Sequence, residues 1–441
     1  MADMRTIDTH GKTRPGNGAA ASRGGVIWNR ALFQLLGALL IAVAVPYAVA
    51  GLVTPYLMQL SLYYVSMAAS TASIAAGFWM FRNLSSFPGI RASYYILPVF
   101  LSNFVAAFTL LLMARLAYSR PLLIASLLLA LAWFYIVYLM IQRRQRLIIA
   151  VVPFGRVDSL LGIDTVVWNQ LAGPGLPADC ALVTADFDHD LAPEWLNFLA
   201  ECALHDVPVL HYKQLRQSLT GQVQIERLSE NAYGSLVPNA TYIAIKRLID
   251  STVALVLMPV LLPLFAGVAL AVRLDSPGPA FFRQTRIGYR GRPFRVWKFR
   301  TMRTGKAAVP APGDRLQQAI TQHNDPRVTR LGRWLRRTRI DELPQAFNVL
   351  RGEMSWIGPR PEAEDLSRWY EAELPFYRYR HVVRPGISGW AQVSQGHVAD
   401  LDSVLKKLNY DFFYISRCSL WIDVLILLRT IKTMLTGFGS R

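Results

Sequence analysis

The chain has 441 residues, of which 53% are hydrophobic and only 17% are charged, and its net charge at pH 7 is +18. Disordered chains need low hydrophobicity, and soluble globular proteins average about 25% charged residues, so this composition argues against both classes. The three cysteines (Cys180, Cys202 and Cys418) are too few and too scattered for a disulfide framework or a zinc cluster, which favours a reducing environment.

The charge is divided unevenly along the chain. Residues 1–150 have a net charge of +10, residues 151–240 have −7, and residues 241–441 have +15. Three segments with such different charges predict three parts with different roles, and the length of the chain also suggests two or three domains.

The first part contains long runs without any charged residue. Such runs cover residues 31–81, 92–114 and 121–142. A helix that spans a membrane needs about 20 apolar residues, so the first run is long enough for two helices with a break near Pro55. The sequence therefore predicts four transmembrane helices within residues 31–143.

Basic residues indicate how these helices are oriented. Residues 1–30 form a basic tail, Arg82 and Arg91 flank the second loop, and Arg143 and Arg144 follow the fourth helix. Positive charges accumulate on the cytoplasmic side of membrane proteins. We therefore expect the tail, the second loop and everything that follows the fourth helix to be cytoplasmic.

Residues 144–235 are predicted to form a small α/β domain with a parallel sheet. The expected strands and helix are residues 147–152, 180–184 and 207–210, and residues 195–202. The first strand is followed by Pro153-Phe154-Gly155-Arg156 and not by a Gly-x-Gly-x-x-Gly turn. We therefore predict a Rossmann-like domain without a nucleotide, with a structural or regulatory role. Its acidic residues are interpreted as a solvated loop and not as a metal site (Asp186, Asp188, Asp190 and Glu194).

Another apolar segment, at about 247–273, contains Pro259 and Pro263. Proline removes a backbone donor and kinks a helix, so a kinked span and a helix that returns to the same side both fit. Positive charges flank both ends, which places both ends on the cytoplasmic side. We favour the re-entrant helix, with Pro263 and Pro259 at the kink.

An adjacent pair of carboxylates, Asp341 and Glu342, lies next to a segment rich in arginine. A carboxylate can act as a nucleophile toward phosphorus, and a second one can hold Mg²⁺. Arginine can bind phosphate through two hydrogen bonds. A random Asp-Glu pair is usually ordinary surface, and an arginine run is often a solvated face or a lipid anchor. Position alone therefore does not identify the nucleophile.

Residues 241–441 resemble the catalytic domain of the bacterial sugar transferases, the monotopic phosphoglycosyl transferases. The motifs that carry the resemblance appear in family order: Lys246-Arg247, Ser276-Pro277-Gly278-Pro279, Lys298-Phe299-Arg300-Thr301-Met302, Asp341-Glu342-Leu343-Pro344-Gln345, Gly358-Pro359-Arg360-Pro361 and Pro385-Gly386. Four spans followed by a degenerate nucleotide-fold domain resemble the larger, polyprenyl-phosphate hexose-1-phosphate transferase subgroup. The implied fold class is a membrane helical bundle, a degenerate Rossmann-like α/β domain, and an α/β catalytic domain with a re-entrant membrane helix.

The resemblance also implies roles for individual residues. It makes Asp341 the nucleophile and Glu342 its partner, and it places both near Mg²⁺. The implied phosphate-binding residues are Arg336 and Arg360, with Lys298 and Arg300 as weaker candidates. The region expected to meet the nucleotide or the sugar contains Pro385, Gly386, Gly389 and Gln392.

For the whole protein, the resemblance implies a reaction at the cytoplasmic face of the bacterial inner membrane. A sugar 1-phosphate, commonly that of a hexose, would pass from a UDP-sugar to undecaprenyl phosphate with release of UMP. The reaction would follow a ping-pong scheme and would start the synthesis of exopolysaccharide, capsule or O-antigen. Membrane lipids are expected partners, nucleic acid is not, and a homodimer is expected from the middle domain.

Two alternatives have different consequences. A membrane glycosyltransferase that moves only the sugar would release UDP and would use the carboxylates to hold the metal. A non-enzymatic basic membrane scaffold would bind acidic lipid or nucleic acid without any turnover. Replacement of Asp341 and identification of the released nucleotide separate these alternatives.

Overall fold

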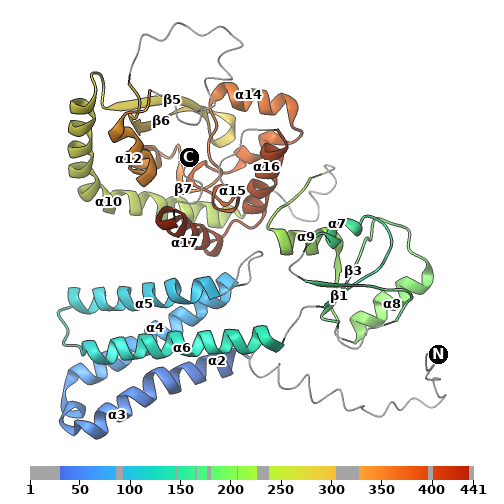
Figure 1. Cartoon of the computed structure of the whole chain (residues 1–441), viewed down its shortest axis with the longest axis horizontal. Coiled ribbons are helices and arrows are strands. Elements are labelled where there is room, and N and C mark those ends of the chain that lie inside the picture. The colour runs from blue at the N-terminus through green and yellow to red at the C-terminus, as the bar shows by residue number, and fades with distance from the viewer. Residues whose placement is uncertain are drawn as a thin grey trace. The chain divides into compact units, whose positions relative to one another are not determined.

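The computed structural model describes residues 30–85, 93–144, 148–163, 166–175, 180–205, 207–225, 238–303, 327–395 and 401–436 (Figure 1). The chain divides into two compact units. The first contains the N-terminal helices and a small parallel sheet, and the second begins at Lys213 and contains the Asp-Glu pair. Residues 1–29, which carry most of the predicted basic tail, and Arg91 lie outside the described residues.

Four apolar helices occupy the beginning of the described chain, as expected. The first combines α2, a π-helical turn (η1) and α3, and a 3-10 turn (η2) leads into the second. These elements and the two remaining helices are α2 (Ala31–Leu39), η1 (Leu40–Ala44), α3 (Val45–Val53), η2 (Pro55–Gln59), α4 (Ser61–Ser85), α5 (Ser93–Met113) and α6 (Arg120–Arg144). Three of the four are long and apolar enough to cross a membrane, namely 31–53, 95–113 and 120–141.

Helix α4 is the exception, because serines dilute its apolar sequence. Ser66, Ser70 and Ser73 are buried inside the bundle. The hydroxyl groups of Ser70 and Tyr47 are 3.1 Å apart, and Ser66 Oγ accepts a hydrogen bond from the Ser119 main-chain N–H at 2.7 Å. Small hydroxyl side chains allow helices in a bundle to approach closely and to hydrogen-bond to one another. The polar side of α4 is therefore directed into the bundle.

The small sheet has four parallel strands in the order β2-β1-β3-β4. Its elements are β1 (Ile148–Val151), α7 (Asp158–Leu161), β2 (Val167–Gln170), β3 (Leu182–Ala185), α8 (Pro193–Leu204) and β4 (Val209–His211), followed by α9 (Tyr212–Thr220). The three expected strands and the expected helix are present. Strand β2 was not predicted, because this edge strand is mostly exposed and has no buried alternation.

The loop after β1 is filled by a side chain of the protein itself. Gly155 has φ +76°, and a Cβ atom at this position would lie 2.4 Å from Asp186 Oδ2. The same carboxylate accepts hydrogen bonds from the main-chain N–H groups of Arg156 and Asp188, at 2.9 and 3.0 Å. In dinucleotide-binding folds, main-chain amides of this loop bind phosphate. The expectation of a solvated loop is therefore wrong at Asp186, which is 3% exposed and bound by main-chain amides. Its contacts support the prediction of a nucleotide-free domain, which stays a prediction.

The second unit contains the following elements, in chain order: α10 (Ala240–Asp275), β5 (Phe281–Ile287), η4 (Tyr289–Gly291), β6 (Pro293–Phe299), α12 (Arg330–Thr338), η5 (Ile340–Gln345), α13 (Ala346–Arg351), β7 (Ser355–Ile357), α14 (Glu364–Glu373), η6 (Tyr377–Val382), β8 (Gly386–Ser388), α15 (Trp390–Gln395), α16 (Leu401–Ser416) and α17 (Leu420–Thr436). Strands β5 and β6 form an antiparallel hairpin, and β7 pairs with β8 in parallel.

Helix α10 is continuous over 36 residues and includes both Pro259 and Pro263. Its axis turns sharply midway along the element (Figure 1). One stripe, which includes Leu261 and Phe265, is buried against α12 and η5, whereas apolar residues on its other sides are exposed. The helix is long and apolar enough to cross a membrane. A bent, apolar helix is compatible with the re-entrant path, which stays a prediction.

Candidate active site

The carboxylate pair is positioned by the way in which helix α12 ends. Arg339 follows α12 with φ 60°, a left-handed conformation that is strained for a residue other than glycine. The chain then enters the short 3-10 helix η5, which packs against β6. This turn buries Asp341 and Glu342, which are 8% and 6% exposed. Backbone strain of this kind is often found at functional sites.

Glu342 is held by two cations from separate elements. Lys298 Nζ, on β6, donates to Glu342 Oε1 at 2.8 Å. Arg360 donates from Nη2 to Oε1 at 2.7 Å and from Nη1 to Oε2 at 3.3 Å. Burial alone would raise the pKa of Glu342, but the charges and hydrogen bonds of Arg360 and Lys298 outweigh it and lower the pKa well below its usual range. Glu342 is therefore a fixed anion.

Asp341 has the opposite properties. Burial, followed by the negative charge of Glu342, raises the pKa of Asp341 to about 6, against the opposing charges of Lys298, Arg339 and Arg360. Within the described part of the chain, its buried Oδ1 atom has no hydrogen-bond partner. A buried oxygen without a partner costs folding free energy, and its lone pairs are not committed to another group in the described structure. Two adjacent carboxylates with separated pKa values can take different chemical roles.

The dyad lies among positive charges that are themselves largely buried. Burial lowers the pKa of Lys298 to about 8, with Glu342 opposing the shift and Arg360 and Arg286 adding to it. Burial and the charge of Arg360 lower the pKa of Arg286 to about 10. Three cations around two carboxylates favour an anionic ligand, because each added negative charge relieves repulsion among them.

The other two predicted cations make different contacts. Arg336 Nε donates to Thr301 Oγ1 at 2.9 Å, on the side of α12 that faces the end of β6. The Arg300 guanidinium donates to the carbonyl groups of Pro277, Val272 and Ser276, at the C-terminal end of α10. Arg300 therefore joins β6 to α10, and no contact between Arg300 and the dyad is present among the described residues.

The predicted residues between 385 and 392 lie beside the loop that carries Arg360. A Cβ atom at Gly386 would lie 2.0 Å from Gly358 N, and one at Gly389 would lie 2.3 Å from Gly358 O. Gly386 N donates to Pro359 O at 3.0 Å, and Pro385 O accepts from Ser355 N at 2.9 Å. These residues therefore fix the loop that contains Arg360.

Gln392 lies in the first turn of α15, and a Cβ atom at Gly389 would lie 3.4 Å from its Oε1 atom. Its Nε2 atom is 3.5 Å from Ile387 O, and its buried Oε1 atom has no partner in the described structure.

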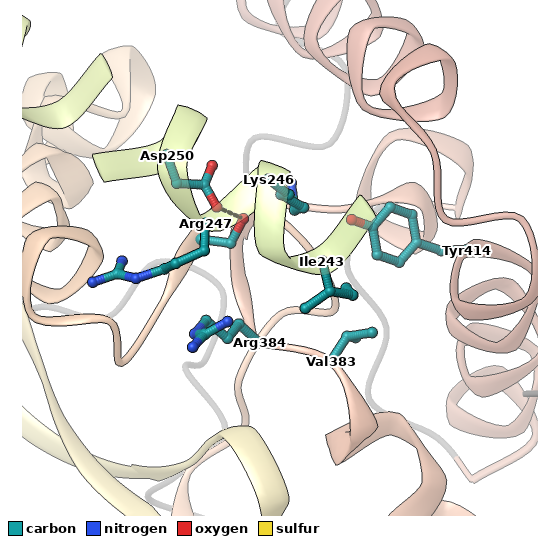
Figure 2. A pocket seen from close by; sticks show the side chains of 8 residues that line it. Ile243, Lys246, Arg247, Asp250, Val383, Arg384 and Tyr414 are labelled. Carbon is teal, nitrogen blue, oxygen red and sulfur yellow. Dashed lines mark hydrogen bonds between the residues drawn. The ribbon is translucent and has the colours of Figure 1, made fainter. Parts of the chain in front are cut away.

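A separate pocket lies where the beginning of α10 meets the sheet of β7 and β8 (Figure 2). Its polar residues bond to the protein: Lys246 to Asp423, Arg247 to Val349 O and Leu350 O, and Arg384 to Gly352 O. Ser355 Oγ donates to Asp250 Oδ2 at 2.6 Å. None of the lining residues belongs to the dyad, and the contacts within the pocket anchor the beginning of α10.

Candidate metal ligands occur in both units. Among the described residues, the one group of three potential ligands is Asp186, Asp188 and His211, in the small sheet. The dyad offers two carboxylates, and Mg²⁺ commonly takes one or two carboxylates together with substrate phosphates and water. The unpaired Oδ1 atom of Asp341 beside the anionic Glu342 fits this chemistry.

Some residues of the site were not expected from the sequence. Arg286, Glu362, Arg380 and Asp411 form charged contacts around the Arg360 loop. Arg286 belonged to the basic run, but nothing in the sequence ranked it above its neighbours. Arg380 and Asp411 are distant from the dyad along the chain, and only the fold brings them to Arg360.

Comparison with known proteins adds a separate observation. The family model of the bacterial sugar transferases matches residues 241–437. The chain is 44% identical over 375 residues to the UDP-N-acetylgalactosamine-undecaprenyl-phosphate N-acetylgalactosaminephosphotransferase of Aeromonas hydrophila. The aligned region covers 85% of this chain and 87% of that protein. A match of this length extends well upstream of the family model.

Two further relatives match shorter parts of the chain. The UDP-glucose:undecaprenyl-phosphate glucose-1-phosphate transferase of Xanthomonas campestris pv. campestris is 44% identical over 43% of this chain and 38% of its own length. The protein of the same description from Escherichia coli (strain K12) is 43% identical over 42% of this chain and 39% of its own length.

Proposed function

Because the chain belongs to the bacterial sugar transferase family and is therefore a membrane-associated phosphoglycosyl transferase, we propose that it transfers a sugar 1-phosphate from a UDP-sugar to undecaprenyl phosphate and releases UMP. The observation that carries the proposal is the contrast within the dyad. Glu342 is a fixed anion with two cationic partners, whereas Asp341 has a raised pKa and an unpaired oxygen.

In the first half-reaction, the ionised Asp341 carboxylate attacks the β-phosphorus of the UDP-sugar. A bond forms between the carboxylate oxygen and phosphorus, the bond from phosphorus to the bridging oxygen breaks, and UMP leaves with that oxygen. The product is a phosphosugar bound to Asp341 as an acyl phosphate. Lys298 and Arg360, whose positions are fixed by Glu342, stabilise the negative charge that moves to the leaving phosphate.

In the second half-reaction, a phosphate oxygen of undecaprenyl phosphate attacks the same phosphorus atom. The bond to Asp341 breaks, the free carboxylate returns, and the product is the diphosphate-linked lipid sugar. In this ping-pong scheme the two substrates use one site in turn.

Mg²⁺ is the proposed cofactor. Glu342 and Asp341 would hold it together with substrate phosphate oxygens, and the ion would supply charge neutralisation at the diphosphate. Arg336, which is partly exposed beside Thr301, is proposed as a further phosphate contact.

The proposed location is the cytoplasmic face of the inner membrane, with α10 entering the bilayer and returning to the same side. Support comes from the cations on both sides of the apolar stretch of α10: Lys246 and Arg247 lie near the start of the helix, Arg273 lies in its last turn, and Arg283 follows on β5. The dyad would then lie at the level of lipid phosphate groups, where undecaprenyl phosphate presents its own. A homodimer and a role at the start of polysaccharide synthesis belong to the same proposal.

The candidate donor sugars can be ranked by the relatives to which the chain is similar. The family subgroup favours a hexose, whereas the relative that matches most of the chain is named for N-acetylgalactosamine. UDP-N-acetylgalactosamine and UDP-glucose are therefore the first two donors to compare.

The test uses the full chain in nanodiscs with Mg²⁺, undecaprenyl phosphate and a panel of UDP-sugars. Release of UMP with at least one donor supports the proposal. Release of UDP would identify a transferase that moves only the sugar. If no donor yields a nucleotide, the central proposal fails. A second arm omits the lipid, where a ping-pong enzyme releases one UMP per active site and leaves a phosphosugar on Asp341.

A further inference from the structure

The loop from Gly358 to Pro361 determines where Arg360 meets the dyad. Both terminal nitrogen atoms of Arg360 donate to Glu342, so the guanidinium is fixed at one end. The side chain starts from the main chain between Pro359 and Pro361. The guanidinium can keep its geometry only if this short segment of main chain is held as well.

A buried arginine lies behind this segment. Arg380, in η6, is 4% exposed, and its Nη2 atom donates to the Arg360 carbonyl oxygen at 2.9 Å. The same nitrogen donates to Asp411 Oδ2, on α16, at 2.9 Å. Its Nη1 atom donates to the hydroxyl group of Tyr377. Arg380 thus connects the Arg360 main chain to η6, which carries both Arg380 and Tyr377, and to α16, which carries Asp411.

A packing role would not need these charges. Asp411 is 1% exposed, so both members of the ion pair have lost nearly all contact with water. The desolvation of such a pair often equals or exceeds the attraction between its members, and apolar residues of similar volume can be more stabilising. A planar guanidinium, however, can direct donors to a carbonyl and to a carboxylate at the same time.

From these contacts we infer that Arg380 is a positioning residue, which fixes the Arg360 carbonyl so that the Arg360 guanidinium meets Glu342, while Asp411 holds Arg380 in place. The structural part of this inference stands on the contacts alone. Its kinetic part rests on the proposed function. The two parts are therefore tested by different measurements.

The test variant is Arg380→Lys, which keeps the positive charge but loses the planar fork. Asp411→Asn, of almost equal volume, releases Arg380 from its partner and provides a second variant. The matched control is Lys246→Arg, a cation exchange in the buried ion pair with Asp423. This pair anchors α10, and Lys246 makes no direct contact with the loop in the described structure.

The structural measurement is hydrogen–deuterium exchange of the full chain in nanodiscs. We expect the peptide that covers residues 355–363 to exchange about tenfold faster in Arg380→Lys and in Asp411→Asn, because a charge-assisted hydrogen bond to the loop is lost. In Lys246→Arg this peptide should change less than twofold, because Asp423 reaches it only through Tyr414, whose hydroxyl group donates to Ile357 O. Wild-type exchange of the peptide in both test variants would overturn the inference.

The kinetic measurement is UMP release over a range of UDP-sugar concentrations. Displacement of Arg360 should lower kcat about 10- to 100-fold with little change in the KM of the UDP-sugar.

The outcomes separate the two proposals. If the wild-type protein releases no UMP, the proposed function fails, while the exchange measurement still decides whether Arg380 fixes the loop. If Arg380→Lys only lowers the melting temperature and leaves both the exchange of residues 355–363 and kcat unchanged, Arg380 has a packing role and the inference is wrong.

Discussion

Each of the two units buries an aspartate, and the two carboxylates are satisfied in opposite ways. Asp186, beside the small sheet, is 3% exposed and accepts hydrogen bonds from two main-chain amides. Asp341 is 8% exposed, and its Oδ1 atom has no partner within the described structure. A satisfied carboxylate can stabilise a loop, whereas an unsatisfied one costs folding free energy. The difference is what the proposed function predicts, with Asp341 available for the reaction and Asp186 bound into a loop.

The largest expected effect is that of Asp341→Asn. The variant removes the nucleophile, so UMP release should fall at least about 1,000-fold. The melting temperature should stay the same or rise, because a buried charge with an unpaired oxygen has been removed. Turnover tests the catalytic role of Asp341, and the melting temperature tests whether its unpaired oxygen lowers stability. Turnover within tenfold of the wild-type value would show that Asp341 is not the nucleophile.

The next largest effect is expected at Lys298, one of the two cations that hold Glu342. Lys298→Met keeps the length of the side chain but removes its charge and its hydrogen bond to Glu342. We expect kcat to fall about 100-fold, the size typical of a lost electrostatic contact in an active site. Arg300→Met is the comparison variant on the same strand end, and it should affect stability more than kcat, since Arg300 bonds to α10. Equal losses of kcat in both variants would contradict the assignment.

A smaller effect is expected from pH. Asp341 must be ionised to attack phosphorus, and its pKa is about 6, so kcat/KM should fall about tenfold per pH unit below this value. Lys298 must be protonated, and its pKa is about 8, so activity should also decline above this value. The expected profile is a bell between these limits. A flat profile from pH 5 to pH 7 would argue against an aspartate with a raised pKa.

The smallest effect on catalysis is expected at the other aspartate. Asp186→Asn replaces a carboxylate oxygen by an amide group that cannot accept a hydrogen bond from the loop. We expect a loss of about 1–3 kcal/mol in the unfolding free energy of the small sheet and UMP release within twofold of the wild-type rate. Chemical denaturation and the nucleotide assay measure the two quantities. A large loss of turnover in a folded Asp186→Asn variant would show that this carboxylate, too, serves catalysis.

Much of the architecture follows from local patterns in the sequence. Uncharged runs predict the four N-terminal helices, and short apolar runs predict three of the four strands of the small sheet. Strand β2 was missed because an exposed edge strand carries almost no apolar signal. Helix α4 was predicted as apolar, yet its buried serines make it less apolar than its neighbours, and only the packing of the bundle explains their place.

The candidate site was predictable in its motifs but not in its contacts. The resemblance identified Asp341, Glu342 and Arg360, and the structure brings all three together with Lys298. It could not indicate that Lys298 bonds to Glu342 whereas Arg300, two residues later, bonds to the end of α10. Such choices depend on where a strand ends and on what packs against it. The partners of Arg380 likewise come from segments far apart in the chain.

The close approach of Gly358, Gly386 and Gly389 has a consequence for how variation in this protein is interpreted. None of the three has room for even a methyl group, because their neighbours in the contact are main-chain atoms that cannot rotate away. A saturation mutagenesis screen scored by activity would therefore find all three positions intolerant. They would look like residues of the reaction, although the selection at these positions acts on the distance between two segments of backbone.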